Sequence, residues 1–296
     1  MPAHLRTSRC RVTSADLARR DIMRMAAALS AAATGVVCPA LAADPDCVRI
    51  GGTGMALATM RVIGQDFTAG EPGTTVDVMP SLGTSGGLSA LAAGAIDLAL
   101  SARPLKDNES GKKLQSQAYA RTPLAFVAHQ SAAVDRITLD AVARIFNGDL
   151  TTWAKGGLIR LVRREPSDAD WSLLRSLSPD MAQAVEAALQ RPGLLTVATD
   201  QENGDALERM TGSFGMMSIG QLRAEARHLV PLALDGVSPE VNELAVGRYT
   251  LLRTLYIAWR GPISPKAGRF LAFLHSGQAA SLLSKLGHIP LLDPNV

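Results

Sequence analysis

The chain contains few cysteines, and most of them lie where they cannot form a lasting disulfide. Two of the three, Cys10 and Cys38, fall within the first 42 residues, which we predict to be a removable leader. Once that leader is cleaved, Cys47 is the only cysteine left. We therefore expect no intramolecular disulfide in the mature protein.

Histidine is also scarce, with five in 296 residues. The four that follow the leader are His129, His228, His275 and His288. None has a cysteine, histidine or carboxylate partner at metal-ligand spacing, so we expect no metal site. No serine, cysteine or histidine is arranged as a nucleophile with its base, so we predict that the chain is not an enzyme and needs no cofactor.

A nicotinamide-dependent enzyme is the alternative within the enzyme class. The stretch GGTGMAL follows a predicted strand and resembles part of a dinucleotide-binding turn, and Asp77 lies roughly where a ribose-binding acid would fall. Leu57, however, occupies the third small-residue position of that motif. A protein exported from the cytoplasm would also lack a supply of this cofactor, so we disfavour this interpretation.

The chain has little excess charge of either sign. Its formal charge is +3, but residues 1–42 hold six arginines and two aspartates. Without them, 24 basic and 25 acidic residues remain. A nucleic-acid-binding function therefore loses its main support.

The first 42 residues have the pattern of a signal peptide. A basic start precedes an apolar run, and the small residues Ala40 and Ala42 predict cleavage after Ala42. The pair Arg19–Arg20 resembles the twin-arginine export motif, which leaves that route and ordinary secretion both open. We predict a periplasmic protein.

After the leader, short β-rich segments alternate with helical ones. CVRIGG, TTVDVMP and IDLALSA are predicted strands, and LATMRVIGQDFTAG and GGLSALAAGA are predicted helices between them. Alternation of this kind favours an α/β fold with a parallel sheet. Hydrophobic residues make up 47% of the chain, enough for one or two domains.

Three strand-to-helix junctions combine glycines with hydroxyl groups: GGTGMA, LGTSGGL and RREPSDADW. In α/β folds, ligands collect at such junctions because free backbone N–H groups point toward them. Hydroxyls at Thr53, Thr84, Ser85 and Ser167 could help to surround a small oxyanion. The alternative is that these hydroxyls only cap their helices.

Several longer motifs follow one another in an order typical of a known family. They are GTSGGLSALAAGAIDLALSARPL, ITLDAVARIFNGDLTTW, VRREPSDA, GSFGMMSIGQL and YTLLRTLYIAWRGPISPKAGRFLAFLHSGQAASLLSKLGHIPL. Together they resemble the phosphate-binding proteins of bacterial phosphate ABC transporters, a family within the periplasmic-binding-protein-like superfamily. The resemblance spans nearly all of residues 48–292.

The resemblance implies an α/β, two-lobed periplasmic-binding-protein fold of type II, with the ligand cleft between the lobes. Residues 43–124 and 226–296 would form lobe one, and residues 125–225 would form lobe two. The family binds its anion with an SSGG-type hydroxyl and helix start, an arginine four residues before a serine, and the backbone after that serine. Matched by position, the implied ligand-binding residues are Thr53, Gly54, Met55, Thr84, Ser85, Gly86, Arg163, Ser167 and Asp168.

This sequence departs from the family pattern at two places. Ala102 replaces the aspartate that accepts the proton of hydrogen phosphate, and the usual SGT becomes Ser167, Asp168 and Ala169. Asp168 either replaces the lost acceptor, which would favour phosphate over sulfate, or pairs with Arg163 or Arg164 and cancels the positive potential. A carboxylate that merely stabilises its helix start is the simplest alternative.

The resemblance therefore predicts an extracytoplasmic solute-binding protein that captures a small oxyanion, phosphate above all, for an ABC importer. Its expected partners are the phosphate-like anion and an ABC permease, and we expect a monomer. The alternative is a sensor or envelope-assembly protein in which the anion site is altered or lost.

Overall fold

The computed structural model describes residues 46–110 and 113–291. The predicted signal peptide, residues 1–42, lies outside this part of the chain. None of the helices formed by the described residues combines the length and apolar character needed to cross a bilayer.

The first three strands of the described residues lie within the predicted segments CVRIGG, TTVDVMP and IDLALSA. In chain order, the strands of the described residues are β1 (Cys47–Gly52), β2 (Thr75–Val78), β3 (Leu98–Ser101), β4 (Leu114–His129), β5 (Arg136–Ile137), β6 (Arg160–Leu161), β7 (Arg163–Arg164), β8 (Thr196–Val197), β9 (Ser213–Ser218), β10 (Leu229–Pro231), β11 (Ala233–Leu234), β12 (Leu252–Arg260) and β13 (Ile289–Pro290).

The helices alternate with these strands along the chain. They are α1 (Gly54–Gly70), α2 (Gly83–Ala92), α3 (Asp107–Ser110), α4 (Leu139–Asn147), α5 (Asp170–Arg175), α6 (Pro179–Gln190), α7 (Asp200–Arg209), α8 (Ile219–Ala224), α9 (Val241–Ala245), α10 (Pro265–Leu274) and α11 (Gly277–Lys285), with a 3₁₀ turn at Gln130–Ala132. The sequence analysis assigned no element to the segment that forms α7.

The main sheet has the strand order β2-β1-β3-β12-β4-β9-β6. The prediction of a parallel sheet is correct only in part. Strand β1 pairs in parallel with β2 and β3, but β12 is antiparallel to both β3 and β4, and β4 is antiparallel to β9. The reason is topological: β12 comes from the C-terminal part of the chain and enters between β3 and β4, without a βαβ crossover to impose parallel pairing.

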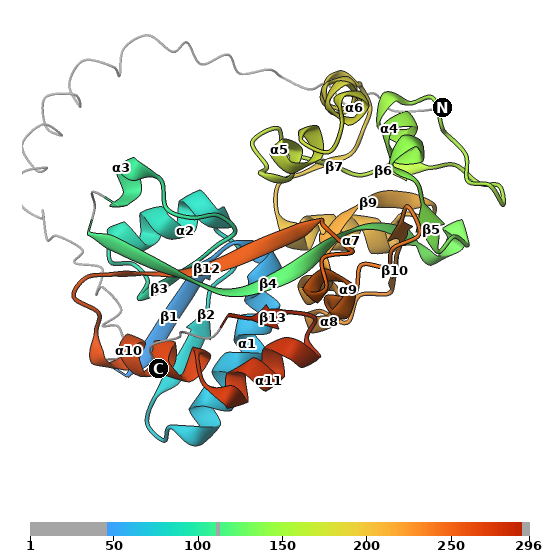
Figure 1. The fold of residues 1–296 in the computed structure, drawn as a ribbon. Helices are drawn as coiled ribbons and strands as arrows, with labels where there is room; N and C mark the ends of the chain where they lie inside the picture. Colours follow the sequence, from blue (N-terminus) through green and yellow to red (C-terminus); the bar gives the residue numbers. More distant parts are fainter. Residues whose placement is uncertain (1–45, 111–112, 292–296) are drawn as a thin grey trace, which may run out of the picture. The chain divides into compact units, whose positions relative to one another are not determined.

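The two largest hydrophobic cores of the described residues lie along this sheet, joined by the long strands β4 and β12, which run side by side in Figure 1. The α1 core includes the buried residues Ile50, Leu57, Ile63, Leu100, Tyr119, Leu255 and Phe270. The β9 core includes the buried residues Leu124, Phe126, Val142, Phe146, Trp171, Met181 and Phe214. Strand β4 contributes to both, so one continuous strand supports two separately packed halves.

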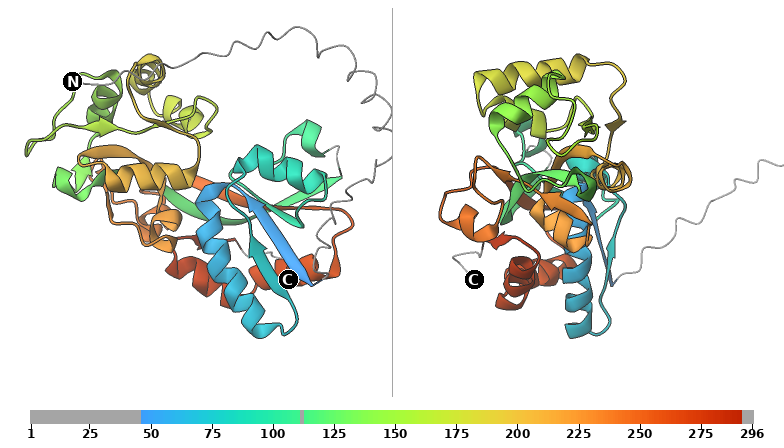
Figure 2. Two further views of the ribbon diagram at one scale, coloured as in Figure 1. Left: turned by 180° about the vertical axis from the view of Figure 1, so that it is seen from behind. Right: turned by 90° about the vertical axis from the view of Figure 1, so that its right-hand side faces the viewer.

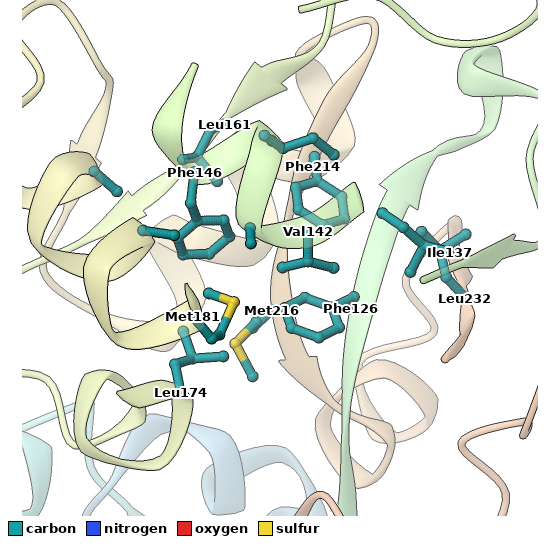
Figure 3. Packing of buried hydrophobic residues seen from close by; sticks show 14 of the residues in the cluster. Phe126, Ile137, Val142, Phe146, Leu161, Leu174, Met181, Phe214, Met216 and Leu232 are labelled. Atoms are coloured by element: carbon teal, nitrogen blue, oxygen red, sulfur yellow. The ribbon is translucent and has the colours of Figure 1, made fainter. Parts of the chain in front are cut away.

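Aromatic rings organise the β9 core. The ring of Phe214 on β9 stacks on Phe126 of β4 at 5.7 Å between centroids and meets the edges of Phe146 and Trp153 at 6.5 and 5.9 Å. Figure 3 shows Phe126, Phe146 and Phe214 with Met216 among them. This packing fixes α4 and the segment leading to β6 against the sheet.

Local signals explain where the helices start and stop. The Thr138 hydroxyl accepts a hydrogen bond from the backbone N–H of Ala141 at 3.1 Å and so caps α4, and Gly148 ends the same helix with a φ of 92°. Such left-handed conformations favour glycine. Ser178 and Ser264 cap α6 and α10 in the same way as Thr138 caps α4.

His288, just before β13, is fully buried and packs against α1 and the start of α8. Its Nε2 lies 3.0 Å from the Thr59 hydroxyl on α1, and its ring lies so close to Gly220 of α8 that a Cβ there would be 2.2 Å from Cε1. Burial, aided by the nearby charge of Arg223, lowers the pKa of His288 to about 4. The folded protein therefore holds this ring neutral.

This buried ring makes the fold acid-sensitive. Below the unfolded pKa of 6.5, His288 binds a proton in the unfolded chain but not in the folded one. The free energy of unfolding therefore falls as the pH drops toward 4, by up to about 3 kcal/mol. We expect His288→Gln, which keeps a polar partner for Thr59, to lose less stability than the wild type between about pH 7 and pH 4.5. Urea unfolding of both proteins measures this, and parallel pH profiles would contradict it.

Candidate functional site

A cavity of about 420 Å³ lies where the three predicted junctions meet. Its lining comes from the start of α1, the β2–α2 junction with the start of α2, the β3–α3 loop, the β7–α5 segment, the start of α7 and the start of β12. Of the nine predicted ligand-binding residues, those that line it are Thr53, Met55, Thr84, Ser85, Gly86, Ser167 and Asp168. Gly54 and Arg163 are absent from the lining among the described residues.

The start of α2 offers free donors to this cavity. Within the part of the chain that the structure describes, no side chain caps this helix, and Gly83 enters it with a φ of 64°. The first N–H groups of a helix have no intrahelical acceptor and carry partial positive charge. The Thr84 hydroxyl accepts from the N–H of Ala102 at 3.1 Å, so its own hydrogen is left to donate.

The start of α1 is different, because a carboxylate already occupies it. The N–H of Met55 donates to Asp200 Oδ2 at 2.9 Å, and the side chain of Gln201 donates to the carbonyl of Gly54 at 3.0 Å. A Cβ at Gly54 would lie within 2.8 Å of Asp200 and Gln201, so this approach requires glycine. Figure 2 (left) shows the start of α1 beside α7.

Arg163 is held away from the cavity by neutral acceptors. Its guanidinium donates to the Thr196 hydroxyl at 2.9 Å and to the carbonyls of Ala188, Leu189 and Arg191 at 2.9 to 3.0 Å. These carbonyls lie at the C-terminal end of α6, where a cation is favourable. In this structure Arg163 therefore anchors a helix end.

Arg164 is the arginine of this segment that lines the cavity. Its guanidinium pairs with Asp168 at 2.7 Å and Asp200 at 3.1 Å and also donates to the carbonyl of Thr199, and its side chain is 11% exposed. Asp168 in turn accepts from the N–H of Asp170 at 2.8 Å. Of the interpretations left open for Asp168, both the pairing with Arg164 and the helix-start contact are present.

Two further arginines reach the cavity from other elements. Arg253 on β12 pairs with Asp170, and each of their side chains is 12% exposed. Arg103, in the loop before α3, pairs with Glu109 through two contacts of 2.8 Å. The ionisable side chains that line the cavity, among the described residues, are thus Arg103, Arg164, Arg253, Asp168, Asp170 and Asp200. Their formal charges cancel.

Two of these aspartates, Asp170 and Asp200, ionise less readily than an ordinary aspartate. Burial, reinforced by the neighbouring charge of Asp168, raises the pKa of Asp170 to about 6. Burial also raises the pKa of Asp200, against the opposing effect of Arg164. In the described part of the chain, no three histidine, cysteine or acidic side chains are placed to hold a metal ion. The cluster is therefore suited to accepting protons and hydrogen bonds.

Three charged residues of the cavity were not predicted as site residues: Asp170, Asp200 and Arg253. A signal for Asp200 existed, because Thr199 and Glu202 form a complete capping box at the start of α7, and that pattern predicts a helix start there. No local pattern marks Arg253, which reaches the site only because β12 pairs with β3 and β4.

The chain is similar in sequence to two curated proteins. The chain is 25% identical over 234 residues to the phosphate-binding protein PstS of Bacillus subtilis, covering 76% of this chain and 75% of that protein. It is 22% identical over 218 residues to PstS of Borreliella burgdorferi, covering 70% and 77%.

A solved structure supports the fold. A proposed phosphate ABC transporter substrate-binding protein of Clostridium perfringens, with bound phosphate, has a TM-score of 0.69 at 18% identity and covers 83% of this chain and 99% of its own. The predicted two-lobed α/β fold is confirmed, and so is the family resemblance. Since the model of the PBP superfamily domain matches residues 26–278, the chain belongs to the PBP superfamily.

Proposed function

We propose that this chain is an extracytoplasmic solute-binding protein, not an enzyme, that captures phosphate for an ABC importer. The observation that carries the proposal is the uncapped start of α2, which faces the same cavity as three arginines. Backbone N–H groups, a donor hydroxyl and guanidinium groups together suit a small tetrahedral oxyanion. The curated relatives, named as phosphate-binding proteins, support phosphate as that anion.

We assign the contacts as follows. The first N–H groups of α2 and the hydroxyls of Thr84 and Ser85 hold one side of the anion, and Ser167 lines the other side. Arg164 supplies the main positive charge, in place of the predicted Arg163, because it is the one of the two whose guanidinium faces the cavity lining. Thr53 adds a hydroxyl at the start of α1.

The carboxylates give the site its preference for a proton-bearing anion. The family's acceptor aspartate is missing, because Ala102 stands in its place. Asp168 and Asp170 line the same cavity, and each can accept a hydrogen bond from hydrogen phosphate. Sulfate carries no proton near neutral pH, so its oxygens would face the carboxylate oxygens of Asp168 and Asp170 with no hydrogen between them and be repelled. The second candidate is a sensor or envelope-assembly protein with an altered anion site. The equal number of arginines and aspartates in the cavity supports it, because they leave no net positive charge to attract an anion.

Calorimetric titration with phosphate and with sulfate tests the proposal. We expect phosphate to bind, and sulfate to bind at least about tenfold more weakly. A buried carboxylate that receives no hydrogen bond from the anion costs on the order of 1–3 kcal/mol of binding free energy. Comparable affinity for both anions would contradict the role of the carboxylates. Failure of phosphate to bind near pH 5.5 and near pH 8 would leave the sensor or assembly function as the better candidate.

The remaining assignments concern the whole protein. We propose export through the leader at residues 1–42, delivery of phosphate to an ABC permease, and action as a monomer. For the lobes, Leu232, Tyr249 and Leu251 pack in the β9 core. This supports a return to lobe one near Leu252, later than the predicted residue 226.

A further inference from the structure

Asp200 makes the two contacts that a bound oxyanion would be expected to make. Its Oδ2 accepts from the N–H of Met55 at the start of α1 at 2.9 Å, and its Oδ1 meets Arg164 at 3.1 Å. Met55 was predicted to bind the ligand, and Arg164 carries the main positive charge of the proposed site. A single carboxylate from α7 thus binds a donor on each side of the cavity.

Helix α1 has no cap of its own on this side. In the described chain the Thr53 side chain makes no capping hydrogen bond to α1, although threonine is a common cap. The carboxylate that takes this role comes from 145 residues further along the chain. The start of α2, which also lines the cavity, has no such carboxylate among the described residues. The protein therefore fills the anion position at α1 and leaves the one at α2 open.

We propose that Asp200 is an internal anion that competes with the ligand, so that phosphate binds tightly only when the Asp200 carboxylate is displaced or neutralised. This rests on the proposed function, because it concerns the same cavity. A dianion and a carboxylate that share Arg164 repel each other, and the repulsion disappears when the carboxylate is removed or protonated. Asp200 thereby sets the affinity of the site and its dependence on pH.

The groups that face Asp200 come from several elements. They are Arg164 on β7, Asp168 in the loop after it, Asp170 on α5, the Met55 N–H on α1, and Glu225 at the end of α8. The three carboxylates and the buried position oppose ionisation of Asp200, and the arginine and the N–H favour it. As the pH falls, Asp200 binds a proton, its competition weakens, and anion affinity rises.

The decisive variant is Asp200→Asn, which removes the charge and keeps an oxygen for the Met55 N–H. At about pH 8 we expect it to bind inorganic phosphate at least about tenfold more tightly than the wild type, since the negative charge that opposes the anion is gone. The two proteins should differ less as the pH falls toward about 5.5, because the raised pKa of Asp200 lets the wild-type carboxyl bind a proton more readily than an ordinary aspartate. Asp180→Asn, an exposed carboxylate in the first turn of α6, is the matched control and should leave affinity within about twofold.

Two further measurements keep the proposal open to refutation. Asp200→Ser, whose hydroxyl is a good helix cap, should tighten binding in the same way if Asp200→Asn folds poorly. Affinity for sulfate, which does not titrate in this range, should rise between about pH 8 and pH 5.5 more in the wild type than in Asp200→Asn, in which Asp170 still titrates. Equal or weaker phosphate binding by the neutral variants, or the same rise in sulfate affinity in both proteins, would overturn the proposal.

These results also separate the proposal from the function on which it rests. If the wild type binds phosphate and both neutral variants bind it no better, the competition is refuted and the phosphate-binding function stands. If neither the wild type nor a neutral variant binds phosphate at either pH, the proposed function fails and the competition fails with it.

Discussion

Arg164→Ala should lose both phosphate binding and much of the stability of the fold. The substitution leaves Asp168 and Asp200 facing each other without the guanidinium that pairs with both. Because this side chain is only 11% exposed, removing it resembles breaking a buried ion pair, which costs about 3–5 kcal/mol. Phosphate also loses its main positive partner, so we expect affinity to fall by at least about a hundredfold.

The neighbouring Arg163→Ala is the matched comparison, since it removes the same side chain one position earlier. It leaves the carbonyls of Ala188, Leu189 and Arg191 without their donor, which should cost about 2–3 kcal/mol of stability. Phosphate affinity of the folded protein should change by less than about threefold, because this guanidinium lies outside the cavity lining. Urea unfolding and calorimetric titration of both variants separate the two roles, and the opposite ranking of affinities would restore Arg163 as the main contact.

Phe214→Ala should cause the largest loss of stability in the hydrophobic core. The side chain is fully buried and contacts three other aromatic rings. Truncation leaves a cavity among them, and such substitutions cost about 3–5 kcal/mol. Urea unfolding measures this loss, and Leu158→Ala, at a leucine that is 58% exposed, is the control that should stay within about 0.5 kcal/mol of the wild type.

Phe214 lies outside the cavity, so its loss should lower the stability of the protein without changing its affinity for phosphate. Strand β9 lies between β4 and β6, away from the lining of the cavity. The molecules of Phe214→Ala that remain folded should therefore bind phosphate with nearly wild-type affinity, and saturating phosphate should recover part of the lost stability by mass action. A variant that stays folded but binds poorly would contradict this separation.

Much of the fold was predictable from the sequence because its signals are local. Period-two and helical patterns located β1, β2, β3, α1 and α2. The ends of α4 likewise have local causes, in the Thr138 hydroxyl and in Gly148. The glycine- and hydroxyl-rich junctions identified Thr84, Ser85 and Ser167, which line the cavity. In each case a few neighbouring residues contain the physical cause, whether a cap, a left-handed turn or an apolar face.

The tertiary structure alone decided which charged groups meet in the cavity. Adjacent residues of a strand point to opposite sides, and pairing of β7 with β8 sets Arg163 opposite Thr196 and Arg164 opposite Val197. That pairing turns Arg163 toward the end of α6 and Arg164 toward the cavity. The sequence by itself determined that an arginine pair follows β6 and that the junctions carry donors. It could not determine which arginine faces the ligand, or that Asp200 and Arg253 join the site, because those contacts depend on strand register and on segments far apart in the chain.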